Sequence, residues 1–281
     1  MTERQQEALS PEEPRVAPAR AKPRSLGFVQ SSGEVLLFAL RAIGKIPVAV
    51  RTNPAEVLRQ AGILVRMHLF VVLFLAGMLG AMIGICGSFL FESLGLDSYV
   101  AIMIAVPMVR GVVAIVVGWV FAAKAGCGMV AELGAMRIGE EIDALEVMGV
   151  PSIPYLVGTR LAANLLVMPF LYLAALGTHF FFAQLFFVRI LGTVSSGGYE
   201  DILYLLQDPS DLLFSVAAGA VVGFIVTVIS CYHGYTTQGG PVGVGRSTAK
   251  SMQVNLVLIS LTVMAMVQAY YGGGLNVPVG T

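Results

Sequence analysis

Charged side chains gather in residues 130–151, within a chain that is otherwise mostly apolar from residue 62 onward. The charged residues there are Glu132, Arg137, Glu140, Glu141, Asp143 and Glu146, and Lys124 lies just upstream. Apolar residues recur between them at the spacing of one helical face, at Ile138, Ile142, Leu145 and Met148. An apolar stripe with a charged flank is suited to docking, because the stripe fits a groove and the charges select the partner.

Local spacing adds two ion pairs to this interpretation. Arg137 lies three residues before Glu140 and four before Glu141, the separations at which side chains meet on a helix. The alternative is an ordinary solvated helix in a loop. The connection from residue 124 to residue 154 is long for neighbouring helices, which favours a functional segment.

A glycine-rich stretch at residues 240–247 fits a phosphate-binding loop, apart from Arg246 in place of the usual lysine. Such a loop needs a strand before it and a helix after it, whereas an apolar segment precedes this one. We therefore predict that this chain does not hydrolyse ATP. Arg246 is a candidate for contact with a partner protein or with anionic lipid.

The histidines and cysteines predict no metal site and no catalytic residue. The three histidines lie in or beside different apolar segments, and no Asp or Glu lies at the centre of a segment to relay protons. This weighs against a proton- or sodium-coupled transporter. The three cysteines are far apart and lack zinc or redox spacing, so we interpret them as small buried side chains.

Composition places the chain in the membrane. Its 281 residues are 57% hydrophobic and 12% charged, where a soluble domain has about 25% charged residues. The mean hydropathy is +0.82. The apolar runs are long and continuous, which predicts an all-α integral membrane protein. A formal net charge of zero argues against a nucleic-acid surface.

Five apolar segments are long enough to cross a bilayer as helices. We place the spans at residues 63–90, 99–123, 155–187, 212–235 and 252–271, and the charged helix at residues 130–148. Fifteen of the seventeen Lys and Arg residues precede the first span or lie in its first turn, or flank the loops after the second and fourth spans. The positive-inside rule therefore predicts a cytoplasmic N-terminus, a cytoplasmic charged helix and an extracytoplasmic C-terminus.

The residues before the first span divide into two parts. Residues 1–31 are polar, contain four prolines and lack apolar periodicity, so we expect a disordered cytoplasmic tail. Residues 32–52 are too short to span and are interrupted by Arg41 and Lys45, but their apolar residues recur at helical spacing. We expect an amphipathic helix at the membrane interface. A cytoplasmic helix packed on protein is the alternative.

The charged segment resembles the signature of the MlaE/YrbE permease family, the membrane subunits of ABC-type lipid transporters that work with MCE-domain proteins. The matching residues are Ala131, Glu132, Leu133, Gly134, Met136, Arg137, Glu140, Ile142, Ala144, Leu145, Met148 and Val150. Glu141 stands where the family usually has glutamine. The resemblance implies a permease domain over residues 53–281, and the glycine-rich stretch is similar to that of actinobacterial YrbE subunits of Mce systems.

The resemblance implies that the helix at 130–148 is a coupling helix, which docks on an ATPase and transmits ATP-driven motion. The residues expected at this contact are Glu132, Met136, Arg137, Glu140, Glu141, Asp143, Leu145, Glu146 and Met148. The chain itself would bind no cofactor, because ATP and Mg would lie on the partner ATPase.

Arg110 lies inside the second predicted span. An arginine there costs about 2.5–3.5 kcal/mol on insertion scales, so it faces protein or a wet cavity. The family has an arginine in the corresponding segment with an acidic neighbour, whereas Gly111 follows Arg110 here. Two interpretations stay open. Arg110 lines the lipid cavity or outer gate and meets an anionic group, or it is structural and pairs with another subunit.

Small residues recur at every fourth position in two predicted spans, which lets helix backbones approach closely. They are Ala76, Gly80, Gly84 and Ser88 in the first span and Ser215, Gly219, Gly223 and Thr227 in the fourth. We expect at least one of these ladders to pack within the chain. The other is a candidate for contact with a second permease.

The resemblance also implies a set of partners. We expect a heterodimer with a second YrbE-type permease, a cytoplasmic ATPase dimer, and MCE-domain proteins outside the plasma (inner) membrane. The cargo would be lipids such as fatty acids or sterols, with import as the expected direction. Two other classes are weighed against this. A secondary transporter predicts internal repeats, and we find none, whereas a non-transporting scaffold for the MCE assembly predicts no ATPase contact.

Overall fold

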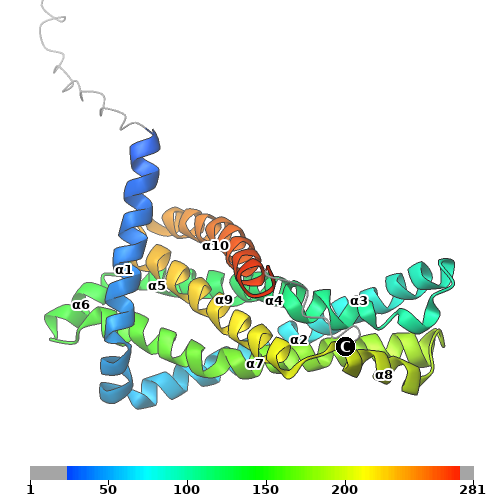
Figure 1. Cartoon of the computed structure of the whole chain (residues 1–281). Helices are drawn as coiled ribbons and strands as arrows, with labels where there is room; N and C mark the ends of the chain where they lie inside the picture. Colours follow the sequence, from blue (N-terminus) through cyan, green and yellow to red (C-terminus); the bar gives the residue numbers. More distant parts are fainter. Residues whose placement is uncertain (1–23, 273–281) are drawn as a thin grey trace, which may run out of the picture. The chain divides into compact units, whose positions relative to one another are not determined.

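The computed structural model describes residues 24–272, and within this range it is built of helices and connecting turns without strands (Figure 1). Residues 38–272 form one compact unit, and residues 24–37 belong to a separate one. The helices are α1 (Arg24–Thr52), α2 (Pro54–Ser93), η3 (Asp97–Tyr99), α3 (Ile102–Ala105), η4 (Met108–Val112), α4 (Val113–Phe121), η5 (Ala122–Gly126), α5 (Cys127–Ile138), α6 (Glu141–Val147), η6 (Ile153–Gly158), α7 (Thr159–Gln184), η7 (Leu185–Ile190), α8 (Ser196–Leu206), α9 (Pro209–Tyr235) and α10 (Gly240–Tyr271).

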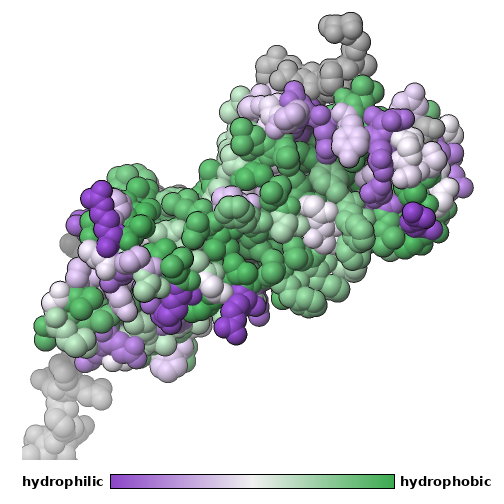
Figure 2. Space-filling view, turned by 90° about the horizontal axis from the view of Figure 1, so that it is seen from below, coloured by the Kyte–Doolittle hydropathy of each residue, from purple (hydrophilic) through white to green (hydrophobic). Residues whose placement is uncertain are grey.

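Five helical stretches within residues 24–272 are long and apolar enough to cross a membrane, which confirms the predicted fold class. They are Pro54–Ser93, Ile102–Ile138, Ile153–Ile190, Pro209–Tyr235 and Gly240–Tyr271. Most extend beyond the predicted spans, because helix-starting residues precede the apolar runs, as Pro54 and Pro209 do at first-turn positions. Figure 2 shows the resulting surface, with apolar residues over the middle and hydrophilic residues gathered toward two ends.

Helix α1 starts before the predicted interfacial helix. Residues 24–31, predicted as part of a disordered tail, are helical, whereas residues 1–23 lie outside the described residues. The helix predicted at 32–52 is present as the rest of α1. Ala42 and Ala49 are fully buried, while Leu40 and Ile43 are exposed, so this part of α1 has a packed face and an exposed apolar side. Its position at a membrane interface stays a prediction.

Helix α7 packs against both α2 and α9, and both small-residue ladders make these contacts (Figure 1). A Cβ atom built on Gly80 would lie 2.2 Å from the carbonyl oxygen of His179 on α7. A Cβ atom on Gly219 of α9 would lie 2.5 Å from the ring of Tyr172, again on α7. Close approach therefore requires glycine at both positions. Both ladders are used within the chain, at least at these positions.

The second membrane-spanning stretch is irregular. It contains two π-helical turns, η4 and η5, and it is kinked at Gly111, whose φ of 173° departs from the helical value. π-Turns inside helices are uncommon and mark positions where the ladder of hydrogen bonds is interrupted. Here η4 carries Arg110, so the interruption coincides with the cation in the middle of the second predicted span.

A short helix that the sequence interpretation missed, α8, fills the connection between the third and fourth spans. Ser195 caps it by accepting a hydrogen bond from the backbone N–H of Gly198 at 3.2 Å. Asp208 then caps α9, and the backbone N–H of Ser210 lowers the pKa of this carboxyl. Tyr199 of α8 is 1% exposed in a core with Ile104 and Phe187, so this connection packs on the spans.

Candidate functional site

The predicted coupling helix at 130–148 is two helices, not one. Helix α5 continues the second span and ends at Ile138, and α6 begins at Glu141. Between them Gly139 closes α5, and Glu140 adopts a left-handed conformation with φ of 58°. Helices commonly end with one left-handed residue, usually glycine, so a glutamate in this role is unusual. The apolar periodicity continued through the break and therefore did not reveal it.

The break divides the predicted apolar stripe. Ile142 is fully buried in the chain's own core, and Leu145 packs against that core. Met148 is 69% exposed and its neighbour Val147, which the stripe did not include, is 89% exposed. The stripe therefore serves two purposes. Its middle holds α6 on this chain, whereas Ile138 before the break and the end of α6 present apolar side chains outward.

Exposed acidic side chains lie at the start of α6, before its apolar end. Glu140, Glu141 and Asp143 are exposed on the first turn of α6 and the residue before it. Arg137 pairs with Asp143 at 2.6 Å, not with Glu140 or Glu141 as the spacing of a continuous helix predicted. The break changes the register, because α6 does not continue the axis of α5. Both side chains are partly exposed, so the pair contributes at most about 1 kcal/mol.

Glu146, predicted to face a partner, turns back toward the chain. Its carboxylate accepts a hydrogen bond from the hydroxyl of Ser152 at 2.5 Å, and that hydroxyl lies 2.9 Å from the Tyr235 hydroxyl on α9. These contacts join the end of α6 to the start of the third span and the end of α9. The sequence interpretation missed Tyr235, because the two residues lie 89 positions apart.

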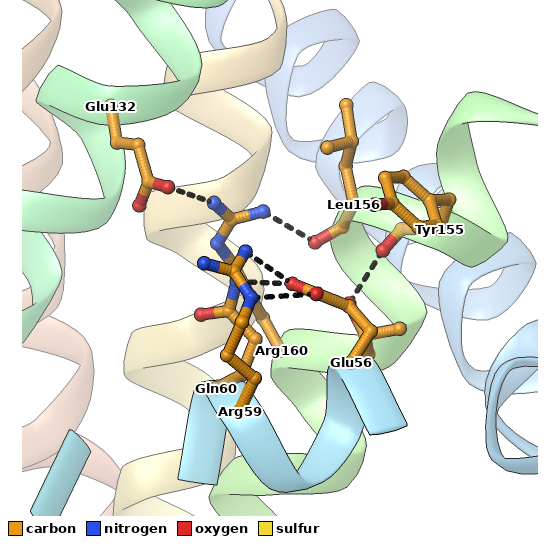
Figure 3. A network of polar contacts seen from close by, with 8 residues as sticks. Glu56, Arg59, Gln60, Glu132, Tyr155, Leu156 and Arg160 are labelled. Carbon is orange, nitrogen blue, oxygen red and sulfur yellow. Dashed lines mark hydrogen bonds and ion pairs between the residues drawn. The ribbon is translucent and has the colours of Figure 1, made fainter. Parts of the chain in front are cut away.

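Glu132 on α5 is fixed by a buried cation (Figure 3). The guanidinium of Arg160, which is 4% exposed on α7, lies 2.8 Å from the Glu132 carboxylate and donates to the carbonyl oxygen of Leu156 at 2.7 Å. Glu56 of α2 lies nearby and accepts from Arg59 and Gln60. In the sequence analysis, Arg160 contributed only to the count of basic residues that predicts the orientation in the membrane. The structure makes it the link between α5 and the start of the third span.

Arg110 forms a second cluster at the other end of the second span. Its guanidinium pairs with Asp211 in the first turn of α9 at 3.1 Å, and both side chains are buried. Tyr271, at the end of α10, donates its hydroxyl to Asp211 at 2.8 Å and places its ring 4.4 Å from the guanidinium. Asp211 and Tyr271 were missed, because Asp211 lies just before the predicted fourth span. One interpretation had Arg110 pair with another subunit, whereas here its partner, Asp211, belongs to the same chain.

The described residues thus present two polar clusters and one exposed apolar tip. A family model described as Permease MlaE matches residues 57–269, from the first turn of α2 to the end of α10. The chain belongs to the MlaE permease family. The match covers all five membrane-spanning stretches together with α5 and α6, and it confirms the resemblance noted in the sequence.

Curated relatives of this MlaE permease are similar over most of its length. A probable ABC transporter permease protein of Rickettsia bellii is 27% identical over 248 residues, which cover 88% of this chain and 95% of the relative. A probable ABC transporter permease protein of Synechocystis is 25% identical over 236 residues, covering 82% and 84% of the two chains. The chain is accordingly a transporter permease and a multi-pass membrane protein.

One relative carries a lipid in its name. The chloroplastic protein TRIGALACTOSYLDIACYLGLYCEROL 1 of Arabidopsis thaliana is 31% identical over 183 residues, which cover 65% of this chain and 52% of the relative. The shared part corresponds to about half of the plant protein.

Arg246, the remaining predicted site residue, lies in the second turn of α10 and is exposed. The glycine-rich stretch that carries it is helical from Gly240 onward and follows α9, so it is not a loop between strand and helix. The phosphate-binding alternative therefore fails on geometry in this MlaE permease. The contact of Arg246 with an ATPase or with lipid stays a prediction, as does the role of Arg110 at a lipid cavity or gate.

Proposed function

We propose that this permease is the membrane subunit of an ATP-driven lipid transporter, and that a separate ATPase docks on α6 and the end of α5. One observation carries the proposal. Val147 and Met148 are exposed at the tip of α6, and the carboxylates of Glu140, Glu141 and Asp143 are exposed at its start. A short helix that presents both apolar side chains and charges outward suits a protein interface, in which an apolar centre is accompanied by polar residues at the rim.

The supports of α6 fit a device that transmits motion. Ile142 seats the helix in the core, and the hydroxyl contacts of Glu146 join it to the third span and to α9. The Arg160–Glu132 ion pair joins α5 to the third span. A force applied to the tip therefore acts on several membrane-spanning helices at once. The match to the permease family and the similarity to probable ABC transporter permease proteins support the same interpretation.

The finer parts of the proposal follow from the family. Lipid as the cargo is supported by the apolar helices and by the lipid named in the Arabidopsis relative. ATP and Mg would be bound by the ATPase dimer, since this chain serves as the permease. We also propose a plasma-membrane location with a cytoplasmic N-terminus, a heterodimer with a second permease, MCE-domain partners outside, and import of lipid. The distribution of Lys and Arg supports this orientation.

Charge reversal at α6 tests the proposal. The chain is co-expressed with its ATPase, and Glu140, Glu141 and Asp143 are replaced by lysine. We expect loss of ATPase co-purification and of lipid uptake by cells. The matched control replaces Glu92 and Asp201, which are exposed beyond the other ends of the spans, by lysine. Intact assembly and uptake in the triple variant would show that α6 is not the docking site.

A further inference from the structure

A cavity of about 370 Å³ opens beside the end of α6. Arg41 and Lys45 of α1 line one wall, and the chain from Gly149 to Pro154 lines the other, with Glu146 between them. None of the functions discussed above uses it. The cavity, called here the basic cavity, combines two long cations with a segment that starts a membrane-spanning helix.

The α1 wall is held in place on both sides of the two cations. Before them, the ring of Phe38 packs against Tyr232 and Tyr235 of α9, with centroids 5.5 and 5.9 Å apart. After them, Ala49 is fully buried, and a Cβ atom on Gly158 would lie 2.9 Å from its methyl group. Arg41 and Lys45 therefore project from a helix whose position over the third span is fixed.

The charges of the basic cavity are unbalanced in favour of anions. Among residues 24–272, Arg41 and Lys45 take part in no ion pair or side-chain hydrogen bond, and both are exposed. The acid in the lining, Glu146, accepts from Ser152, which limits its use as a partner for the cations. The N-terminus of the Ile153–Ile190 helix also lines the cavity, and the end of a helix dipole there favours negative charge.

We propose that the basic cavity binds a phosphate group, with Arg41 and Lys45 as its cationic ligands. Arginine binds phosphate oxygens through two parallel hydrogen bonds, and lysine adds a mobile point charge. The surroundings favour an anionic phospholipid head group over free phosphate. Val48 continues the face of α1 that carries the two cations and is exposed, and Leu40 and Ile43 are exposed on flanking faces. These apolar side chains offer contacts for acyl chains beside the phosphate.

The cavity adjoins α6, where the proposed function places ATPase docking, but its cations Arg41 and Lys45 lie on α1. Its placement in the cytoplasmic leaflet rests on the proposed orientation, but phosphate binding itself does not. A bound lipid there would connect α1 to the segment that follows α6. Failure of the proposed transport activity would therefore leave the binding test below unaffected.

Native mass spectrometry of the detergent-solubilised full chain tests the site. The protein is titrated with dioleoylphosphatidylglycerol, with dioleoylphosphatidylcholine, and with inorganic phosphate. We expect adducts of phosphatidylglycerol at lower concentration than those of phosphatidylcholine. Hydrogen bonds to charged groups are worth about 1.5–3 kcal/mol, so the Arg41→Gln/Lys45→Gln variant should bind phosphatidylglycerol about tenfold more weakly or worse. The Arg41→Lys variant should retain part of the affinity.

The matched control is Arg51→Gln/Lys250→Gln, which removes two exposed cations outside the cavity and should bind like the unmodified chain. Melting temperatures without lipid show that each variant is folded. If only inorganic phosphate binds, with the same dependence on Arg41 and Lys45, the ligand is free phosphate and the site stands. Equal binding of phosphatidylglycerol and phosphate by the Arg41→Gln/Lys45→Gln variant and the unmodified chain would overturn the proposal.

Discussion

Arg110 and Asp211 form an ion pair at 3.1 Å, although they are 101 residues apart and their side chains are only 7% and 3% exposed. The pair joins the kinked second span to the start of α9, and Tyr271 adds the end of α10 through a hydrogen bond and a ring contact. Three helices that are distant in sequence therefore meet at one buried charge pair. The arginine predicted to be expensive in the membrane is compensated by an acid from another helix.

Removing one member of this pair should cost more than removing both. We expect Asp211→Asn to destabilise the protein by about 3–5 kcal/mol, because it leaves the Arg110 charge buried without a counter-ion. Arg110→Gln/Asp211→Asn should be closer to the unmodified chain than either single variant. Thermal unfolding of the detergent-solubilised proteins measures the difference as a double-mutant cycle.

The control for this cycle is Tyr271→Phe, which keeps the ring over the guanidinium and removes only the hydroxyl. It should cost about 1.5–3 kcal/mol, the contribution of a hydrogen bond to a charged group. Additive effects of the two single substitutions at Arg110 and Asp211 would contradict a buried pair.

Gly80→Ala should force α2 and α7 apart. The new methyl group would lie 2.2 Å from a backbone oxygen of His179, which no side-chain rotation can relieve. We expect a loss of about 1–3 kcal/mol, as for other overpacked sites. Gly177→Ala on α7 is the matched control, because nothing lies within 4 Å of its Cβ position. It should gain up to about 1 kcal/mol from helix propensity. Similar unfolding temperatures for the two variants would refute the close approach.

The membrane helices could be predicted from sequence because length and apolarity alone determine them. A run of some twenty apolar residues has no soluble alternative, so all five spans were found. Their ends were less certain, since helices such as α5 and α10 continue into polar sequence once started. The whole family assignment rested on the spacing within residues 130–151, and the family match confirms it.

The candidate site was only partly predictable. Its residues were identified by type, but periodicity cannot show a single left-handed residue, so the break at Glu140 was missed. The partners of Arg110 and Arg160 depend on which helices pack together, a property of the tertiary structure. Asp211 and Glu132 became partners through the contacts of α9 and α7 with their neighbours. A search for an acid at the edge of each span would have found Asp211.

Glu140→Gly should stabilise the turn between α5 and α6. A left-handed conformation costs a residue with a side chain roughly 1–2 kcal/mol, and glycine avoids this cost. Glycine is more flexible in the unfolded chain, however, and this lowers the free energy of unfolding by about 0.5–1 kcal/mol. We expect a net gain of about 0.5–1 kcal/mol in thermal unfolding. Ala144→Gly, inside α6, is the control and should lose about 1 kcal/mol. A loss in the Glu140→Gly variant would mean that the glutamate side chain stabilises the turn.

Substitutions at the tip of α6 can separate an effect on ATPase docking from an effect on folding. Val147 and Met148 are exposed, so Val147→Asp/Met148→Asp should leave the unfolding temperature within the range of ordinary surface changes, about 0.5 kcal/mol. The same substitution places two charges at the centre of the proposed interface. Loss of central interface contacts commonly costs more than 2 kcal/mol, which predicts at least about a thirtyfold weaker ATPase association. Ile142→Asp, on the buried face of α6, should instead unfold the segment. Pull-down of the ATPase together with thermal unfolding distinguishes the outcomes. Unchanged ATPase association with the tip variant would locate the docking surface elsewhere, even if the five spans and the family hold.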